Sequence, residues 1–366
     1  KIVQIDFHHA TTYVLARLAG FEHPEANIIA YSAQYVDDAT NSGIIVFTNH
    51  AMYNHTRSAH KTVDYRNFKE LANHLVWIPF HFLPGNNNRP ADDNSAGDFD
   101  EKIICTPDSP IARDMVSACI MNKNSPYGLH RLGITMHVYA DTWAHQGFAG
   151  VNHKTNDISK LDDEDNPGDS LSSRLKTYFG DKFDSITSKL VGDTLPLGHG
   201  AALSYPDRPY LNWSYKDHHK IKVTRDNPTD FIEASDKMCM AMQRFLLGNP
   251  NANVPGLLDK HKYKIEQLFR DIREEDGEKR HAIWLNHISN GYFDFLPVNL
   301  TYIDKGVGSW KYEALGTTQN TDDKNEKYGY SPLFLKSNWK LFHDALQAHR
   351  FYVIHDLLPQ YGICVA

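Results

Sequence analysis

The sequence predicts a mainly α-helical protein, and three observations support this fold class. Apolar residues recur at the three- and four-residue spacing of amphipathic helices along most of the chain. Runs with the alternating pattern of strands are scarce. The sequence also contains no repeat of fixed period, which argues against solenoids and propellers. With 366 residues, 41% of them hydrophobic, the chain is long enough to bury a large core.

The expected helices follow one another along the chain and several carry start or stop signals. Gly20 follows the first helix, Thr229 precedes the sixth, and Gly248 ends it. The predicted helices cover residues 7–20, 25–36, 111–121, 128–148, 171–191, 230–247, 257–273 and 337–358. Between them we expect polar loops over 84–100 and 151–170, irregular chain over 192–216, and a loop or a few short strands over 290–330.

Composition excludes several classes of protein. The chain has 38 Lys and Arg against 45 Asp and Glu, a net charge of −7, which disfavours a protein that grips a nucleic-acid backbone with a basic face. No apolar run reaches the length of a transmembrane helix. The four cysteines form no CxxC pair, so they indicate neither a disulfide scaffold nor a thiolate metal site. The start at Lys1, without Met, mildly favours an exported, processed chain.

Histidine is frequent, with 21 residues, and one group of them has the spacing of a metal site. His137, Asp141 and His145 recur every four residues within a predicted helix. Each four-residue step turns only about 40° beyond one full turn, so the three side chains project from one helix face. Zinc accepts imidazole and carboxylate ligands, and a carboxylate between two imidazoles can bridge two ions. The alternative is a helix with two His and one Asp on its wetted side.

Other His and Asp residues stand where apolar segments begin, or in loops. Asp6 and His8, with His9 beside them, precede the first helix and could be metal ligands or capping residues. His199 lies between two glycines that allow close approach of the backbone, which suits a ligand in a loop. A solvated face is expected for three histidines spaced five residues apart, namely His50, His55 and His60.

Two further positions remain ambiguous from the residues alone. Asp37 and Asp38 close an apolar run, and either could be a ligand or a general base, because carboxylates are unfavourable at a helix C-terminus. His81 lies in an aromatic stretch, where it is either a core residue or a ligand.

These motifs together resemble the superfamily of zinc-dependent phospholipases C and S1/P1-type nucleases. The similarity is greatest to bacterial phospholipases C of the Pseudomonas fluorescens type, which include Legionella members, and it covers about residues 1–216. It rests on Asp6-x-His8, the stretch 12–21, the helix from His137 to Phe148, and Gly198-His199-Gly200. The implied fold is a phospholipase C-like helical domain with a helical and irregular C-terminal extension.

The resemblance implies a cluster of two or three zinc ions with Asp141 as the bridge between two of them. In this assignment the first ion is held by His137, His81 and Asp37, and the second by His8, with Asp6 as a further candidate. His145 and His199, with Asp207 as a candidate, would hold the third. The chain lacks the His-x-x-x-Glu motif of better-known members, because Leu203 stands four residues after His199. Asp6 and Asp207 are therefore candidate replacements.

The implied reaction is hydrolysis of a glycerophospholipid, with phosphatidylcholine as the expected substrate, to diacylglycerol and the phosphorylated head group. A metal-activated water would attack phosphorus, with Asp37 or Asp38 as general base. No GxSxG or Walker-type motif suggests another mechanism. Tyr205, Tyr210 and Trp213 are candidates for the head-group pocket or a membrane contact, because aromatic rings suit a half-wet boundary and can face a quaternary ammonium. Their alternative role is plain packing.

We accordingly expect a metal-binding catalytic core over residues 1–220 and a helical C-terminal extension over 221–366 packed on it. The expected partner is phospholipid at a membrane surface, without nucleic acid and without a transmembrane segment. The expected location is outside the cell or inside a host cell after translocation, with a role in virulence.

Two alternatives use the same ligands. An S1/P1-like zinc nuclease would need aromatic surfaces that stack bases along a cationic groove. A non-catalytic, zinc-holding host-interaction protein would instead have closed, four-coordinate sites. An HD-type phosphohydrolase is also conceivable from His343-Asp344 and His355-Asp356, but these pairs lie late in the chain and are expected on a helix surface.

Overall fold

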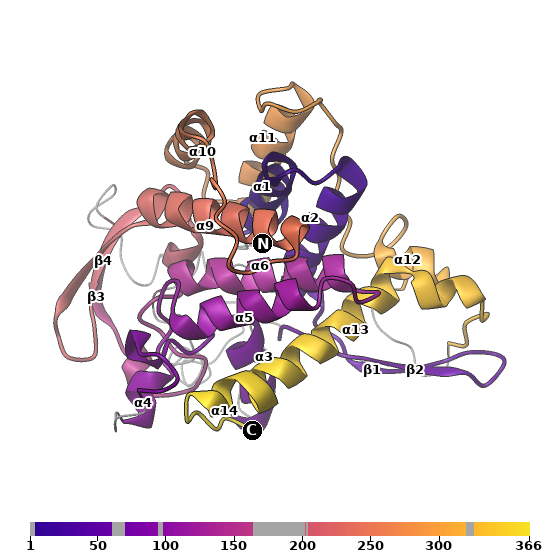
Figure 1. Ribbon diagram of the computed structural model, residues 1–366, viewed down its shortest axis with the longest axis horizontal. Coiled ribbons are helices and arrows are strands. Elements are labelled where there is room, and N and C mark those ends of the chain that lie inside the picture. Colours follow the sequence, from indigo (N-terminus) through magenta and orange to yellow (C-terminus); the bar gives the residue numbers. More distant parts are fainter. Residues whose placement is uncertain (1–3, 61–69, 94–97, 164–201, 203, 320–325) are drawn as a thin grey trace, which may run out of the picture.

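The computed structural model describes residues 4–60, 70–93, 98–163, 202, 204–319 and 326–366, and helices dominate them, which confirms the predicted mainly α class (Figure 1). The α-helices are α1 (Thr12–Ala19), α2 (His23–Asp38), α3 (Glu70–Phe80), α4 (Phe99–Lys102), α5 (Pro110–Met121), α6 (Gly128–Ala144), α9 (Asn227–Leu247), α10 (Asp259–Asp271), α11 (Gly277–Ser289), α12 (Trp310–Leu315), α13 (Asn338–Phe351) and α14 (Leu358–Gln360). Two π-helices, η1 (Asp6–Thr11) and η9 (Tyr352–Leu357), and four short 3₁₀ segments, η3 (Asn86–Asn88), η4 (Lys154–Asn156), η7 (Tyr205–Asp207) and η8 (Pro332–Lys336), complete the helical elements.

Helix α6 forms the centre of the fold. All of its residues except Leu129 are buried. Helices α2, α5, α9 and α13 pack around it, and Figure 1 shows α6 in the middle of the molecule with α9 alongside it. A helix that is enclosed on every side can hold polar side chains only if they find partners inside the protein.

Helices α2 and α6 cross at backbone contact. A Cβ atom added to Gly133 of α6 would lie only 2.3 Å from the carbonyl oxygen of Ile29 in α2, so only glycine fits there. This close approach brings the C-terminal end of α2, with Asp37 and Asp38, toward the middle of α6.

The apolar core joins the two parts of the chain. Its largest cluster contains Phe7 and Met136 from the first 220 residues together with Phe231, Phe269 and Trp284 from the rest. Phe7 packs edge-on against Phe231, with ring centroids 4.8 Å apart. The C-terminal part therefore packs directly on the segment that carries the N-terminal histidines, although the division at residue 220 stays a prediction.

Two small antiparallel sheets were not expected. Strands β1 (Gly43–Val46) and β2 (Met52–His55) form a ribbon, and β3 (Ser159–Asp163), β4 (Asn212–Lys216) and β5 (Lys222–Asp226) form a three-stranded sheet in that order. The expectation of irregular chain was wrong for 212–216. There Trp213 and Tyr215 stack at 5.1 Å on one face, the pattern of a strand rich in aromatic residues.

The helical prediction also missed helices elsewhere in the described part of the chain. Helices α3 and α11 were not predicted, although Asp276 caps α11 and its buried residues recur at helical spacing. The predicted helix over 171–191 lies outside the described residues. The described residues of the region 290–330, namely 290–319 and 326–330, are mostly loop with the short helix α12.

The expected solvated face is wrong for two of its three histidines. His50 is exposed at the tip of the β1–β2 ribbon, whereas His55 and His60 are buried. The aromatic side chain of Trp339 covers His55, with ring centroids 5.2 Å apart. None of the helices in the described part of the chain combines the length and apolar character needed to cross a lipid bilayer.

The crossing of α2 and α6 gives a test of the packing. We expect Gly133→Ala to lower the free energy of unfolding by about 2 kcal/mol, because the added methyl group meets a backbone carbonyl fixed in helix α2, and this outweighs the better helix propensity of alanine. Urea unfolding followed by circular dichroism measures the change. Gly329→Ala is the control, since a Cβ at Gly329 has no described atom within 4 Å. An unchanged stability of Gly133→Ala would contradict this packing.

Candidate metal centre

Helix α6 presents its predicted trio to one site. The Nε2 atom of His137 lies 3.3 Å from Oδ2 of Asp141, and Nδ1 of His145 lies 3.6 Å from the same oxygen. His145 is the first residue after the helix, but its N–H still donates to the carbonyl of Asp141, so the four-residue spacing keeps its direction. The spacing in the sequence therefore corresponds to a real convergence of the three side chains.

The π-helix η1 supplies His8 from the N-terminus. Its Nε2 lies 3.3 Å from Oδ1 of Asp141, and its ring stacks on that of His137 with centroids 3.9 Å apart. His9 points elsewhere, with its Nδ1 at 2.9 Å from Nε2 of His281. His8 rather than His9 thus belongs to the centre, and π-helical segments occur frequently at functional sites.

His81, directly after α3, completes the ring of imidazoles. Its Nδ1 lies 3.4 Å from Oδ2 of Asp141 and 3.3 Å from Nε2 of His137. Its Nε2 lies 2.9 Å from the carbonyl of Ser58, which accepts the proton and leaves Nδ1 as the basic nitrogen toward the centre. This is the orientation that a metal-binding histidine requires.

Asp37 and Asp38 point in different directions. Oδ1 of Asp37 lies 3.8 Å from both His81 Nδ1 and His137 Nε2. Asp38 instead accepts hydrogen bonds from Tyr302 at 2.7 Å and from Gln34 at 3.1 Å. The structure therefore brings Asp37, and not Asp38, to the cluster.

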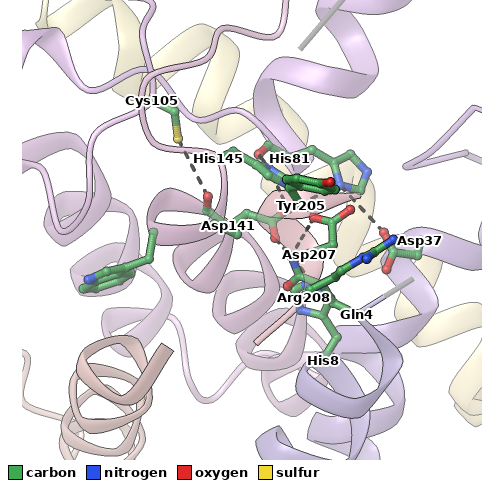
Figure 2. Close-up of polar contacts among 12 residues, drawn as sticks. Gln4, His8, Asp37, His81, Cys105, Asp141, His145, Tyr205, Asp207 and Arg208 are labelled. Carbon is green, nitrogen blue, oxygen red and sulfur yellow. Dashed lines mark hydrogen bonds and ion pairs between the residues drawn. The ribbon is translucent and has the colours of Figure 1, made fainter. Parts of the chain in front are cut away.

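Asp141 is the strongest indication that the cluster could hold a cation. Its side chain is 1% exposed, and neither carboxylate oxygen accepts a hydrogen bond from any described residue. A buried carboxylate without such donors is costly unless a positive charge lies beside it. Figure 2 shows this carboxylate with the imidazoles of His8, His81 and His145 around it.

The cluster contains two groups of three potential ligand atoms, and within each group the three atoms lie within 4.8 Å of one another. His137 belongs to both groups. One group is His8, His137 and Asp141, and the other is Asp37, His81 and His137. Imidazole nitrogens and carboxylate oxygens of this kind could hold a metal ion, and the chemistry of the donor set suits zinc and other divalent transition metals.

The charges of the cluster follow from burial and from mutual contacts. Burial would raise the pKa of Asp141, but the imidazoles of His145 and His137 outweigh it and hold that pKa well below its ordinary value. Burial also lowers the pKa of His137, to about 3, so this imidazole is neutral. Burial raises the pKa of Asp37 to about 6 against the opposing effect of His8 and His81. An ionised carboxylate and a neutral imidazole are the forms that bind metal.

His145 differs from the other imidazoles. Burial disfavours its charged form, yet Asp141 and a contact with Asp207 raise its pKa to about 9. Its Nε2 lies 3.5 Å from Oδ1 of Asp207, and Gln4 donates a hydrogen bond of 2.7 Å to the same oxygen. Asp207 is therefore placed beside His145, as the third-ion assignment requires, while His199 lies outside the described residues.

The prediction of Asp6 as a ligand is corrected. Arg280 of α11 donates from Nε to Oδ2 of Asp6 at 2.7 Å and from Nη2 to Oδ1 at 3.1 Å. Both carboxylate oxygens of Asp6 are thus engaged by a buried guanidinium, whose positive charge offsets that of the carboxylate.

The three aromatic candidates for the head-group pocket lie in the interior. Trp213 is completely buried and donates from Nε1 to Asn227, so it offers no face to a substrate and its role is packing. Tyr205 packs edge-on against Trp213, and the guanidinium of Arg273 lies over the ring of Tyr210. The head-group role of Tyr205 and Tyr210 has no support in these contacts.

Sequence reasoning missed the residues that orient the cluster. The Ser58 carbonyl has no side-chain signature in the sequence. Gln4 lies just before the Asp6-x-His8 motif, and its Oε1 is buried without a hydrogen-bond partner among the described residues. Arg280 lies in a helix that was not predicted, and the capping Asp276 would have been the signal for that helix.

The chain belongs to a family of unknown function, DUF6765, whose model matches residues 3–357. No curated protein and no solved structure matches the chain with significant similarity.

His137 is common to both ligand groups, so its loss should remove metal. We expect His137→Gln to bind at least one equivalent of zinc fewer than the wild type after dialysis, as measured by atomic emission. His130→Gln is the matched control, because His130 is also buried in α6 but binds Asn338 at 3.0 Å outside the cluster. Equal zinc content in the two variants would contradict the assignment.

The raised pKa of His145 predicts how metal affinity depends on pH. With a pKa of about 9, His145 of the metal-free protein is protonated at pH 7 and must lose its proton to bind an ion. The apparent zinc affinity should therefore rise by up to about tenfold per pH unit as pH increases toward 9, and level off above it. Competition with a chromophoric chelator at several pH values measures this slope, and His145→Gln should flatten it. The same slope in wild type and variant would rule out His145 as the titrating ligand.

Proposed function

We propose that the protein is a zinc-dependent phospholipase C that hydrolyses glycerophospholipids, with phosphatidylcholine as the expected substrate. The observation that carries the metal part of this proposal is the Asp141 carboxylate, buried without hydrogen-bond donors from described residues and surrounded by imidazoles. The resemblance of the His and Asp motifs to the zinc phospholipase C superfamily supports the choice of reaction.

The residues of the cluster suit hydrolysis of a phosphodiester. His137, His81 and Asp37 would hold one ion, and His8 would hold another with Asp141 between the two, while His145 and Asp207 are available for a third. Zinc bound in such a site lowers the pKa of a coordinated water to about 7 and offsets negative charge on a phosphodiester. No nucleophilic side chain is then needed.

Asp37 is the residue best suited to accept a proton. Its side chain is 22% exposed, far more than the 1% of Asp141, so it lies at the wet edge of the cluster. A purely structural zinc site is closed by four protein ligands, and this wet edge therefore favours catalysis over the host-interaction alternative.

The choice of phospholipid over nucleic acid rests on charge. A nuclease must hold a polyanion, and the net charge of −7 disfavours that. Secretion or delivery into a host cell, peripheral contact with membranes and a role in virulence belong to the same proposal.

The proposed reaction is tested with the metal-loaded protein. We expect release of phosphocholine from phosphatidylcholine vesicles, loss of that activity with a chelator, and its return with zinc. Single-stranded DNA, assayed in parallel, should stay intact. Chelator-sensitive cleavage of DNA in place of lipid would instead identify a nuclease.

The general base is tested by comparing two neighbouring carboxylates. We expect Asp37→Asn to lower kcat by about 10²–10⁴-fold, the usual contribution of acid–base catalysis. Asp38→Asn should stay within about tenfold of the wild type, because its amide oxygen can still accept the hydrogen bond from Tyr302. Zinc content is measured for both, since Asp37 is also a candidate ligand. The opposite ranking would assign the base to Asp38.

A further inference from the structure

The π-helix η1 is held by the C-terminal part of the chain through three of its residues. Asp6 is bound by Arg280 of α11, and His9 lies at hydrogen-bond distance from His281, the next residue of that helix. Phe7, between them, packs on Phe231 and also on Phe269, with centroids 5.8 Å apart. His8 alone in this stretch faces the metal centre.

Arg280 is the most completely engaged of these partners. Besides Asp6, it donates from Nη1 to the carbonyls of Glu274 and Glu275 at 2.9 and 3.0 Å. Its Nη2 also lies 3.4 Å from the carbonyl of Asp207, the residue beside His145. Both members of the Asp6–Arg280 pair are nearly buried, with 2% and 3% of their side chains exposed.

We propose that Arg280 is a positioning residue for the metal centre. It fixes Asp6, and through Asp6 the direction of His8. The C-terminal part of the chain is in this way required for metal binding, although it supplies no ligand among the residues of the two ligand groups. This inference rests on the metal centre of the proposed function, and it does not depend on which substrate is hydrolysed.

A buried guanidinium suits this task better than other groups. It forms two parallel hydrogen bonds to a carboxylate, which fix the position and the plane of Asp6. Partners that orient metal ligands from outside the coordination shell change metal affinity by about 10–100-fold when they are removed. Removal of Arg280 also leaves the Asp6 carboxylate buried and unpaired, so some loss of stability accompanies the loss of affinity.

The experiment measures zinc affinity of the full-length protein in the folded, metal-free state, by competition with a chromophoric chelator. We expect Arg280→Gln to weaken zinc binding by about 10–100-fold. Arg280→Lys should have a smaller effect, because it keeps the charge but cannot form the paired hydrogen bonds. If Arg280→Gln does not fold, Arg280→Lys and Asp6→Asn serve in its place.

A double-mutant cycle with His8 separates positioning from general destabilisation. If Arg280 acts through His8, Arg280→Gln should have no further effect on zinc affinity in a His8→Gln background. Ile288→Val is the matched control, because it removes a methylene group from a fully buried residue of α11 that makes no polar contact with η1. It should lower the melting temperature and leave zinc affinity unchanged.

Two results would overturn the proposal. The first is a folded Arg280→Gln protein with the zinc affinity of the wild type, and the second is an equal loss of affinity with and without His8. The failure of the phospholipase proposal looks different, because it would appear as a zinc-loaded wild-type protein that does not hydrolyse lipid.

Discussion

The burial of one negative charge, that of Asp141, is the constraint on which the rest of the site depends. Its carboxylate lies in the middle of the most enclosed helix of the fold, with no described hydrogen-bond donor for either oxygen. An isolated charge in an apolar interior has a large free-energy cost, so hydrophobic packing alone would not accommodate this carboxylate. Backbone carbonyls orient the imidazoles of His81 and His145, and the imidazoles of His145 and His137 hold the pKa of Asp141 well below its ordinary value. At this site, charged and polar side chains therefore take the place of apolar packing in the core.

The spacing of α6 and the helical class were predictable because both are local. A four-residue repeat places side chains on one face whatever the helix packs against, and apolar periodicity of 3.6 residues survives in any helical context. The same local reasoning found His8 and His81 as candidates. Their convergence on Asp141 required the tertiary structure, because they come from η1 and from the end of α3, which have no sequence relation to α6.

The remaining choices could not be made from the sequence, since long-range partners decide them. Asp37 and Asp38 are neighbours of the same type. The difference between them comes from Tyr302, more than 260 residues away in the chain, which donates a hydrogen bond to Asp38. The same holds for Asp6. Its carboxylate is a possible metal ligand near His8, but it accepts hydrogen bonds from the distant Arg280 instead. The strands β1 to β5 are only four or five residues long and were missed because so few residues give little periodicity to detect.

The contact between Asp6 and Arg280 also governs the order in which the protein can be assembled. The two residues are separated by 274 positions in the chain. During synthesis, which adds about 5–20 residues each second, helices α2 to α6 can meet while Arg280 is still untranslated. The N-terminal π-helix has no partner for Asp6 until α11 has left the ribosome. A nascent chain that stops short of α11 therefore carries every proposed ligand and lacks the contact that aims the first of them.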